Sequence, residues 1–311
     1  MFKVLVTAQP IVMQAHRFME SFLKKDMDPT FLKSDQTVSK DLLLRHLPSF
    51  DGWILGDEVC DQEVLTSGKD GRLKAILRWG AGLDNVDLRA ASDLQIPVTN
   101  TPGTFANEVA DMALGYLISL SREISQVSEG IFEGEWLKPI GVSLEGKNVG
   151  VVGLGAIGVA ISHRVQVLGM EVFGYDPAFE KSPLEFVKFK TWPLGLEELD
   201  FLILACPLTS ENRKMINRRT LSSIKQGCSI INVARGGLID QEALIEALQV
   251  QKIKSVALDV YETEPLGLSP LLKFKQNLYG SHNASNTFEA VDRTTQIAIE
   301  KLSDFLRRNS E

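Results

Sequence analysis

The 311-residue sequence has few cysteines and no long hydrophobic run. Its three cysteines, Cys60, Cys206 and Cys228, are odd in number and far apart, which excludes a disulfide framework and a cysteine-based metal motif. Each lies in or beside an apolar run, so we expect buried free thiols. No apolar stretch approaches the roughly 20 residues that span a bilayer. The sequence therefore argues against a disulfide-stabilised secreted protein and against a membrane protein.

An excess of positive charge is also lacking. There are 33 basic and 40 acidic residues, a net charge of −7. Nucleic acids and anionic membranes bind clustered positive charge, so we expect neither as a partner. Residues 1–7 lack the longer apolar core and the small-residue cleavage site of a signal peptide, which favours the cytoplasm. No His, Cys, Asp or Glu cluster has metal-ligand spacing, so no metal is expected.

What the sequence does contain is a regular alternation of short β-rich runs and helical patterns. This alternation is typical of α/β proteins with parallel sheets. Strands are expected at residues 3–7, 53–55, 73–78 and 97–99, and then at 148–152, 171–175, 201–205, 229–233, 255–260 and 278–280. We therefore predict two α/β parallel-sheet domains, Rossmann-like or flavodoxin-like, with a cleft between them.

Several helices are expected between and after these strands. They cover residues 84–94, 106–118, 240–248 and 288–305, with Asp240 as the N-cap of the third. Residues 125–141 have a weaker period and would form an arm over the surface or over a partner subunit.

The sharpest local motif is GLGAIG at residues 153–158. Alone it is weak evidence, but it follows an apolar strand, opens a helix and precedes a second strand that ends at Asp176, 18 positions after Gly158. Gly153 would permit the tight turn, Gly155 the approach of a pyrophosphate, and Gly158 close packing of the helix on the strand. An ordinary strand–turn–helix is the alternative.

The residues around this motif predict which dinucleotide it binds. The helix N-terminus, with Ala156 and Ile157, would offer N–H groups to the phosphates. Asp176 would accept hydrogen bonds from the ribose hydroxyls and repel a 2′-phosphate, which favours NAD over NADP. Asp259 ends another apolar strand, where it would hold the nicotinamide carboxamide or serve as a turn cap.

Six further segments carry a family resemblance. They are RWGAGLDNVD at 78–87, NTPG at 100–103 with NEVAD at 107–111, CPLT at 206–209, NVARGG at 232–237, DVYETEP at 259–265 and SHNA at 281–284. With these motifs in this order, the chain resembles the D-isomer-specific 2-hydroxyacid dehydrogenases along nearly its whole length. Its middle is most similar to the phosphoglycerate dehydrogenase branch.

The resemblance implies a discontinuous organisation. Residues 1–100 and 284–311 would form the substrate-binding domain, and residues 101–283 the NAD-binding Rossmann domain. It also implies a homodimer, formed through the helix at 106–118 and the arm.

The resemblance assigns site residues as well. His282 would be the acid/base, Glu264 would orient its ring, and Arg235 would bind the substrate carboxylate and polarise the carbonyl. The remaining assignments are Arg78, Gly80, Ala81 and Gly82 to the substrate, and Cys206, Val233 and Ala234 to the cofactor.

These residues predict reversible hydride transfer between NADH and a small 2-keto acid. Phosphoglycerate dehydrogenases tend to place basic residues after the strand at 53–55, whereas this chain has Gly56, Asp57 and Glu58. Two acids would repel a phosphoryl group unless Arg78 or Lys138 compensates. A phosphoglycerate dehydrogenase remains the first alternative. The second is a non-catalytic, NAD-sensing, corepressor-like binding protein.

Overall fold

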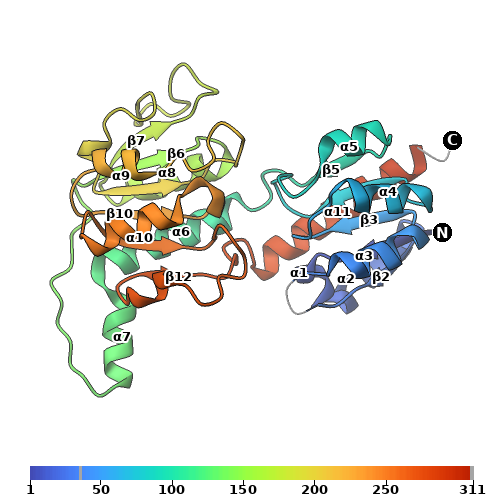
Figure 1. Cartoon of the computed structure of the whole chain (residues 1–311), viewed down its shortest axis with the longest axis horizontal. Coiled ribbons are helices and arrows are strands. Elements are labelled where there is room, and N and C mark those ends of the chain that lie inside the picture. The colour runs from blue at the N-terminus through green and yellow to red at the C-terminus, as the bar shows by residue number, and fades with distance from the viewer. Residues whose placement is uncertain (35–36, 309–311) are drawn as a thin grey trace. The chain divides into compact units, whose positions relative to one another are not determined.

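The computed structural model describes residues 1–34 and 37–308. The chain divides into two compact units. Unit 1 comprises residues 1–105 and 286–311, and unit 2 comprises residues 106–285. The chain therefore leaves unit 1 once and returns to it with its last helix (Figure 1).

Unit 1 is built on a five-stranded parallel sheet in the order β2-β1-β3-β4-β5. This is the flavodoxin-like strand order. The strands are β1 (Phe2–Val6), β2 (Met27–Phe31), β3 (Gly52–Leu55), β4 (Ala75–Arg78) and β5 (Val98–Asn100). Strands β3 and β4 are buried along their whole length, as expected for strands covered by helices on both faces.

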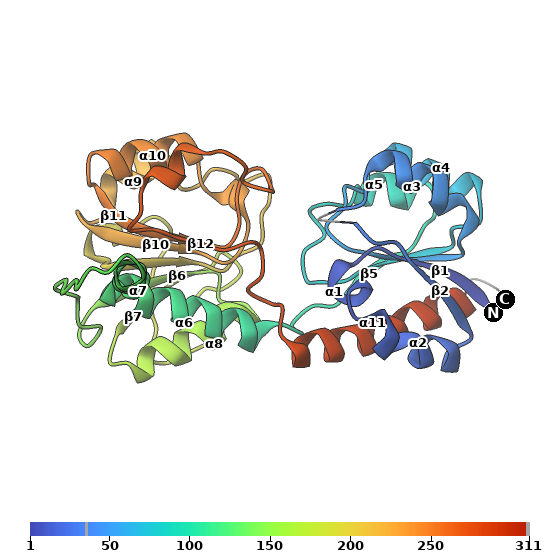
Figure 2. The same ribbon diagram turned by 90° about the horizontal axis from the view of Figure 1, so that it is seen from below.

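Helices cover both faces of this sheet. They are α1 (Gln9–Val12), α2 (Ala15–Lys24), α3 (Lys40–His46), α4 (Gln62–Asp70), α5 (Leu88–Asp93) and α11 (Phe288–Arg308). Figure 2 shows α2 and α11 on one face and α3, α4 and α5 on the other. Trp53, Leu5 and Leu55 are fully buried in the core.

Unit 2 contains a seven-stranded parallel sheet in the order β12-β11-β10-β9-β6-β7-β8. The strands are β6 (Asn148–Val152), β7 (Glu171–Tyr175), β8 (Lys188–Phe189), β9 (Phe201–Leu204), β10 (Cys228–Asn232), β11 (Ile253–Leu258) and β12 (Leu278–Tyr279). The order runs outward from β6 in both directions, as in a Rossmann fold. The point where the order reverses, between β6 and β9, is where such sheets bind ligands.

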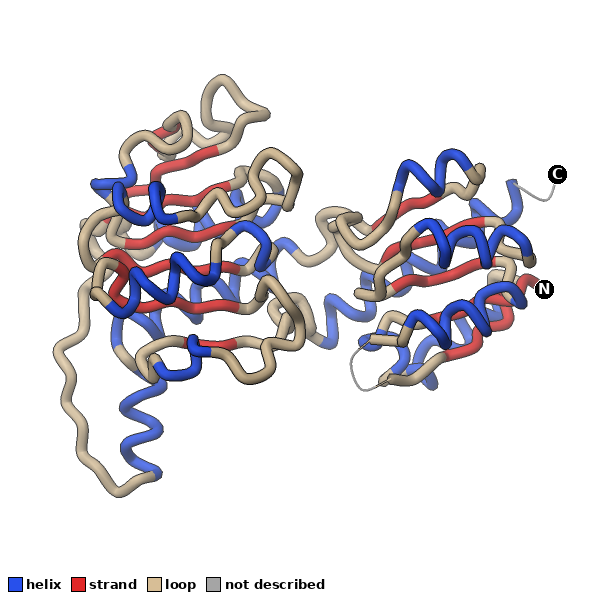
Figure 3. The backbone as a smooth tube through the Cα atoms, in the orientation of Figure 1, coloured by secondary structure: helices blue, strands red, loops and turns tan. Residues whose placement is uncertain are grey.

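Helices also cover both faces of the second sheet. They are α6 (Ala106–Arg122), α8 (Ala156–Val167), α9 (Arg218–Ser223) and α10 (Gln241–Gln249), and α7 (Ile124–Phe132) follows α6 in the chain. In Figure 2, α6 and α8 lie on one face and α9 and α10 on the other. Figure 3 shows α7 and the loop after it extending away from the sheet.

The strand register aligns the ends of six strands of unit 2. Paired residues form one continuous row, which runs Tyr279, Leu258, Asn232, Leu204, Val152, Tyr175. The loops that follow this row carry the glycine motif and all the predicted catalytic residues. One edge of one sheet therefore gathers segments that lie more than 100 positions apart in the sequence.

Three sequence expectations need correction. The helix expected at 84–94 is only α5, because Asp87 caps it and residues before it form a turn with a bridge from Val86 to Cys60. The arm expected at 125–141 begins with helix α7. Cys206 is half-buried rather than buried, whereas Cys60 and Cys228 are buried free thiols.

The helices of the described residues include none that is both long enough and apolar enough to cross a membrane.

Candidate active site

The glycine turn after β6 has three glycines in different environments. Gly153 has a φ of +92°, and a Cβ there would lie 2.7 Å from the Cys206 backbone. A Cβ at Gly158 would lie 1.8 Å from the Gly153 carbonyl oxygen. A Cβ at Gly155 would meet no atom of the described residues within 4 Å. Two glycines are therefore required by the fold itself, whereas the third borders open space.

The surroundings of Gly155 fit a dinucleotide. Gly155 is the N-cap of α8 and has no side chain to bind the first N–H groups of the helix, which leaves them for an anion. Asp176 is half-buried beside the turn: its Oδ2 accepts the Leu154 N–H at 2.7 Å and its Oδ1 the Ala178 N–H at 2.9 Å. The turn thus offers N–H groups for phosphates and a fixed carboxylate for hydroxyls.

The loop after β10 carries Arg235. Asn232 shapes this loop, since its Oδ1 accepts the Ala234 N–H at 3.0 Å and its Nδ2 donates to the Arg235 carbonyl at 2.9 Å. A Cβ at Gly236 would lie 1.8 Å from the Tyr261 carbonyl carbon, so the Arg235 loop packs directly on the loop after β11. Arg235 itself is half-buried, and its Nη1 donates to the Ala234 carbonyl.

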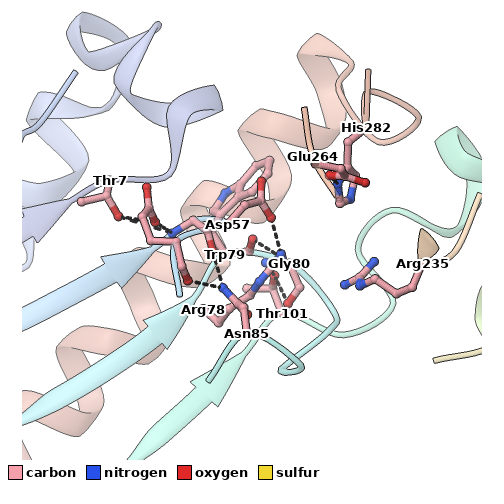
Figure 4. Close-up of polar contacts among 12 residues, drawn as sticks. Thr7, Asp57, Arg78, Trp79, Gly80, Asn85, Thr101, Arg235, Glu264 and His282 are labelled. Carbon is pink, nitrogen blue, oxygen red and sulfur yellow. Dashed lines mark hydrogen bonds and ion pairs between the residues drawn. The ribbon is translucent and has the colours of Figure 1, made fainter. Parts of the chain in front are cut away.

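His282 and Glu264 form a close pair in the same unit. The Nδ1 of His282 lies 2.7 Å from the Oε2 of Glu264, while the Oε1 of Glu264 accepts the Tyr261 N–H at 2.9 Å. Both side chains are about one-third exposed, at 32% and 34%. Figure 4 shows the two side chains together, with the imidazole ring beside the carboxylate.

Asp259 is buried and its carboxylate binds protein groups. It accepts the N–H groups of Asn283 and Ala284 and the hydroxyl of Tyr116. This is the turn-cap role that the sequence left open, and a contact to the nicotinamide carboxamide stays a prediction.

In unit 1, Arg78 ends β4 and is 7% exposed. Its Nη2 forms an ion pair with Asp57 at 2.7 Å (Figure 4). Gly80 has a φ of +137°, and a Cβ there would lie 1.4 Å from the Arg78 Nη1. The Gly80 N–H donates to Thr101 Oγ1, which leaves Ala81 and Gly82 as the candidate N–H donors to a substrate.

The two acids after β3 have opposite environments. Glu58 is 2% exposed and accepts hydrogen bonds from the Thr7 hydroxyl, the Gly56 N–H and the Val38 N–H at 2.9, 2.9 and 3.3 Å. Burial raises the pKa of Glu58. Asp57, by contrast, has a 58% exposed side chain. Of the two acids that the sequence placed beside a substrate, only Asp57 is exposed.

Three residues that shape this region were not predicted from the sequence: Tyr116, Asn232 and Tyr261. Asn232 and Tyr261 lie inside quoted motifs and could have been noticed there. Tyr116 lies in the middle of α6, where its side chain carries no sequence signal.

Residues 114–284 match the family model described as D-isomer specific 2-hydroxyacid dehydrogenase, NAD binding domain. The match covers more than half of the chain and lies within unit 2. The chain belongs to this family. The expected family and the expected pair of parallel-sheet α/β domains are thereby confirmed.

Similar proteins within the family carry different names. A hydroxypyruvate reductase from Thermotoga maritima is 35% identical over 277 residues, which cover 86% of this chain and 89% of that protein. A D-3-phosphoglycerate dehydrogenase from Methanocaldococcus jannaschii is 37% identical over 245 residues, 77% of this chain but only 47% of that protein. The apo-structure of D-lactate dehydrogenase from Escherichia coli has a TM-score of 0.84 and 30% identity, covering 97% and 96% of the two chains.

Proposed function

We propose that this 2-hydroxyacid dehydrogenase reduces a small, unphosphorylated 2-keto acid with NADH, reversibly, and that His282 is its acid/base. The observation that carries the proposal is the 2.7 Å contact between His282 and Glu264. The pair lies on loops at the same sheet edge as a glycine turn that fits a dinucleotide. Unit 2 would bind the cofactor and supply the three catalytic residues, and unit 1 would supply further substrate contacts.

When bound, NADH would supply the hydride that the carbonyl carbon of the keto acid accepts. His282, protonated on Nε2, would donate a proton to the carbonyl oxygen, and in the oxidation direction the neutral ring would take that proton back. Glu264 would orient the ring and stabilise the imidazolium. Arg235, permanently charged, would bind the substrate carboxylate and polarise the carbonyl.

The preference for an unphosphorylated substrate rests on the Asp57–Arg78 pair. Arg78 is the predicted positively charged substrate contact of unit 1, and Asp57 forms an ion pair with it at 2.7 Å. A phosphoryl group would compete with this carboxylate and be repelled by it. The identity to the M. jannaschii phosphoglycerate dehydrogenase favours the phosphorylated alternative, so the substrate needs a direct test.

The cofactor preference and the oligomeric state extend the proposal. Asp176, held beside the glycine turn, would favour NADH over NADPH through repulsion of a 2′-phosphate.

Phe132, Trp136 and Ile140 of the arm are 89%, 78% and 94% exposed. Apolar side chains this exposed along one segment support a homodimer in which a second copy covers the arm. A cytoplasmic location stays a prediction from the sequence.

The test is a steady-state assay of the full chain with NADH and four acids: glyoxylate, hydroxypyruvate, pyruvate and 3-phosphohydroxypyruvate. We expect higher kcat/KM for at least one unphosphorylated acid. A thousandfold preference for the phosphorylated acid would establish the alternative. Tight NADH binding with no turnover of any keto acid would favour the NAD-sensing binding protein.

A single substitution tests the role of Asp57. Asp57→Asn keeps an oxygen that accepts from Arg78 but removes the negative charge. We expect it to raise the kcat/KM ratio of 3-phosphohydroxypyruvate to hydroxypyruvate about fivefold, because an exposed charge contributes about 1 kcal/mol to such a contact. Glu63→Gln is the matched control, since Glu63 is also exposed but pairs with Lys40. If both variants change the ratio equally, the net charge of the protein is the cause and Asp57 has no specific role.

A further inference from the structure

We propose that Asp259 and Tyr116 are positioning residues that fix the backbone of His282, and that the Tyr116 hydroxyl thereby contributes to the rate of proton transfer. The inference rests on the proposed catalytic role of His282. All three residues belong to unit 2, on α6 and on the loops after β11 and β12.

Three successive N–H groups converge on Asp259. The His282 N–H donates to the Asp259 carbonyl oxygen at 2.7 Å. The N–H groups of Asn283 and Ala284 donate to its Oδ1 and Oδ2 at 3.2 and 2.9 Å. Asp259 is 1% exposed, and hydrogen bonds to a carboxylate are strong where water is excluded. Asp259 therefore holds the segment that carries the histidine through both its backbone carbonyl and its carboxylate.

His282 needs this support because its backbone is in the left-handed region, with a φ of 56°. A residue with a Cβ is unfavourable there and keeps the conformation only where its surroundings impose it. A change of φ at this residue would turn the ring away from Glu264. The bonds to Asp259 therefore protect the 2.7 Å contact between the two side chains.

Tyr116 completes the arrangement from the middle of α6. Its hydroxyl donates to the Asp259 Oδ1 at 3.1 Å. A Cβ at Gly280 would lie 2.2 Å from that oxygen and 2.4 Å from the Tyr116 hydroxyl, so the packing requires glycine. Burial, together with the charge of Asp259, raises the pKa of Tyr116, so the hydroxyl keeps its proton and remains a donor. The hydrogen bond from Tyr116 thus connects helix α6 to Asp259, the residue that holds the His282 segment.

The experiment compares wild type with Tyr116→Phe, which removes only the hydroxyl. We expect kcat for keto acid reduction to fall about fivefold, while the Kd for NADH, from fluorescence titration, stays within about twofold. Amide exchange of a peptide containing residues 282–284, measured by mass spectrometry, should become faster on the order of tenfold. A residue that only stabilises the fold would not change exchange at this segment selectively.

Tyr175→Phe is the matched control. Tyr175 is 1% exposed, and its hydroxyl donates to the Leu194 carbonyl at 3.1 Å, away from the 282–284 segment. This variant should keep the wild-type kcat and the wild-type exchange at residues 282–284.

Two results would overturn the inference. One is a Tyr116→Phe enzyme with unchanged kcat and unchanged exchange at 282–284. The other is weaker NADH binding at unchanged kcat, which would place Tyr116 in cofactor binding. If wild type reduces no keto acid, the proposed function fails and the kinetic part of this inference fails with it. The exchange measurement then still decides, separately, whether Tyr116 and Asp259 hold the segment.

Discussion

The most informative perturbation of the cofactor site is Gly155→Ala. Gly155 has φ −71° and ψ −167°, an extended backbone that alanine adopts without strain. The added methyl would meet no described atom of the protein within 4 Å. Alanine is a poorer N-cap than glycine but restricts the unfolded chain, so the two effects nearly cancel. We therefore expect the free energy of unfolding to change by less than about 1 kcal/mol.

The same methyl should weaken NADH binding strongly. If the pyrophosphate docks on the first N–H groups of α8, the methyl occupies the space between them and the phosphate oxygens. Loss of one hydrogen bond to a charged group costs about 1.5–3 kcal/mol, which raises the Kd for NADH by roughly tenfold to a hundredfold. Fluorescence titration gives the Kd, and thermal unfolding of the apo-protein gives the stability.

Gly158→Ala is the contrasting variant. Its Cβ would lie 1.8 Å from the Gly153 carbonyl oxygen, far inside any real contact, so α8 must move away from the turn. Overpacking of this kind costs about 1–3 kcal/mol of stability even without cofactor. The reasoning is refuted if Gly155→Ala binds NADH as tightly as wild type, or if the stability loss falls on Gly155→Ala rather than on Gly158→Ala.

Four further predictions concern the site. His282→Ala should lower kcat on the order of 10²-fold or more with the Kd for NADH nearly unchanged, and unchanged turnover would remove its assigned role. Glu264→Gln removes the carboxylate that stabilises the imidazolium, so the pH at which keto acid reduction falls to half should move to lower values; a shift to higher pH would contradict this. Asp176→Ala should reduce the preference for NADH over NADPH, and an unaltered ratio of kcat/KM values would show that another residue sets it. Burial raises the pKa of Cys206 to about 11, so alkylation by iodoacetamide should be slow at pH 8 and accelerate towards pH 11, with Cys206 modified before the two buried cysteines in peptide mapping.

Much of the fold could be predicted from local pattern. Strands β6, β7, β9 and β10 are mostly apolar, since both faces of a doubly wound sheet are covered by helices. The Asp240 cap of α10 is also as expected, with its carboxylate accepting the Ala243 N–H.

Strand β2 was not predicted, because Pro29 interrupts its sequence pattern. The structure tolerates proline there since β2 is an edge strand, paired on one side only. Whether a segment with proline can form a strand depends on its neighbours in the sheet, which the local sequence does not show.

The candidate site, too, could be predicted from the sequence only in part. The spacing of the glycine motif and the acid at Asp176 were enough to predict a dinucleotide, because a close phosphate approach needs glycine and the ribose hydroxyls need an acceptor. The acid/base at His282 was predicted from the family resemblance. The partner and the burial of each charged side chain were not predictable. Asp57 and Glu58 are adjacent acids, yet one pairs with Arg78 and the other is buried on Thr7.

The sequence by itself thus determined the family, the two parallel sheets and the chemical groups available for catalysis, because local periodicity and motif spacing depend only on neighbouring residues. Only the tertiary structure decided which of those groups are neutralised, buried or held. Strand register brought Asp259 beside residues 282–284, and helix packing brought the Tyr116 hydroxyl to the same carboxylate. The contact of Tyr116 with Asp259 joins positions 143 residues apart, and it follows from packing, which no local pattern contains.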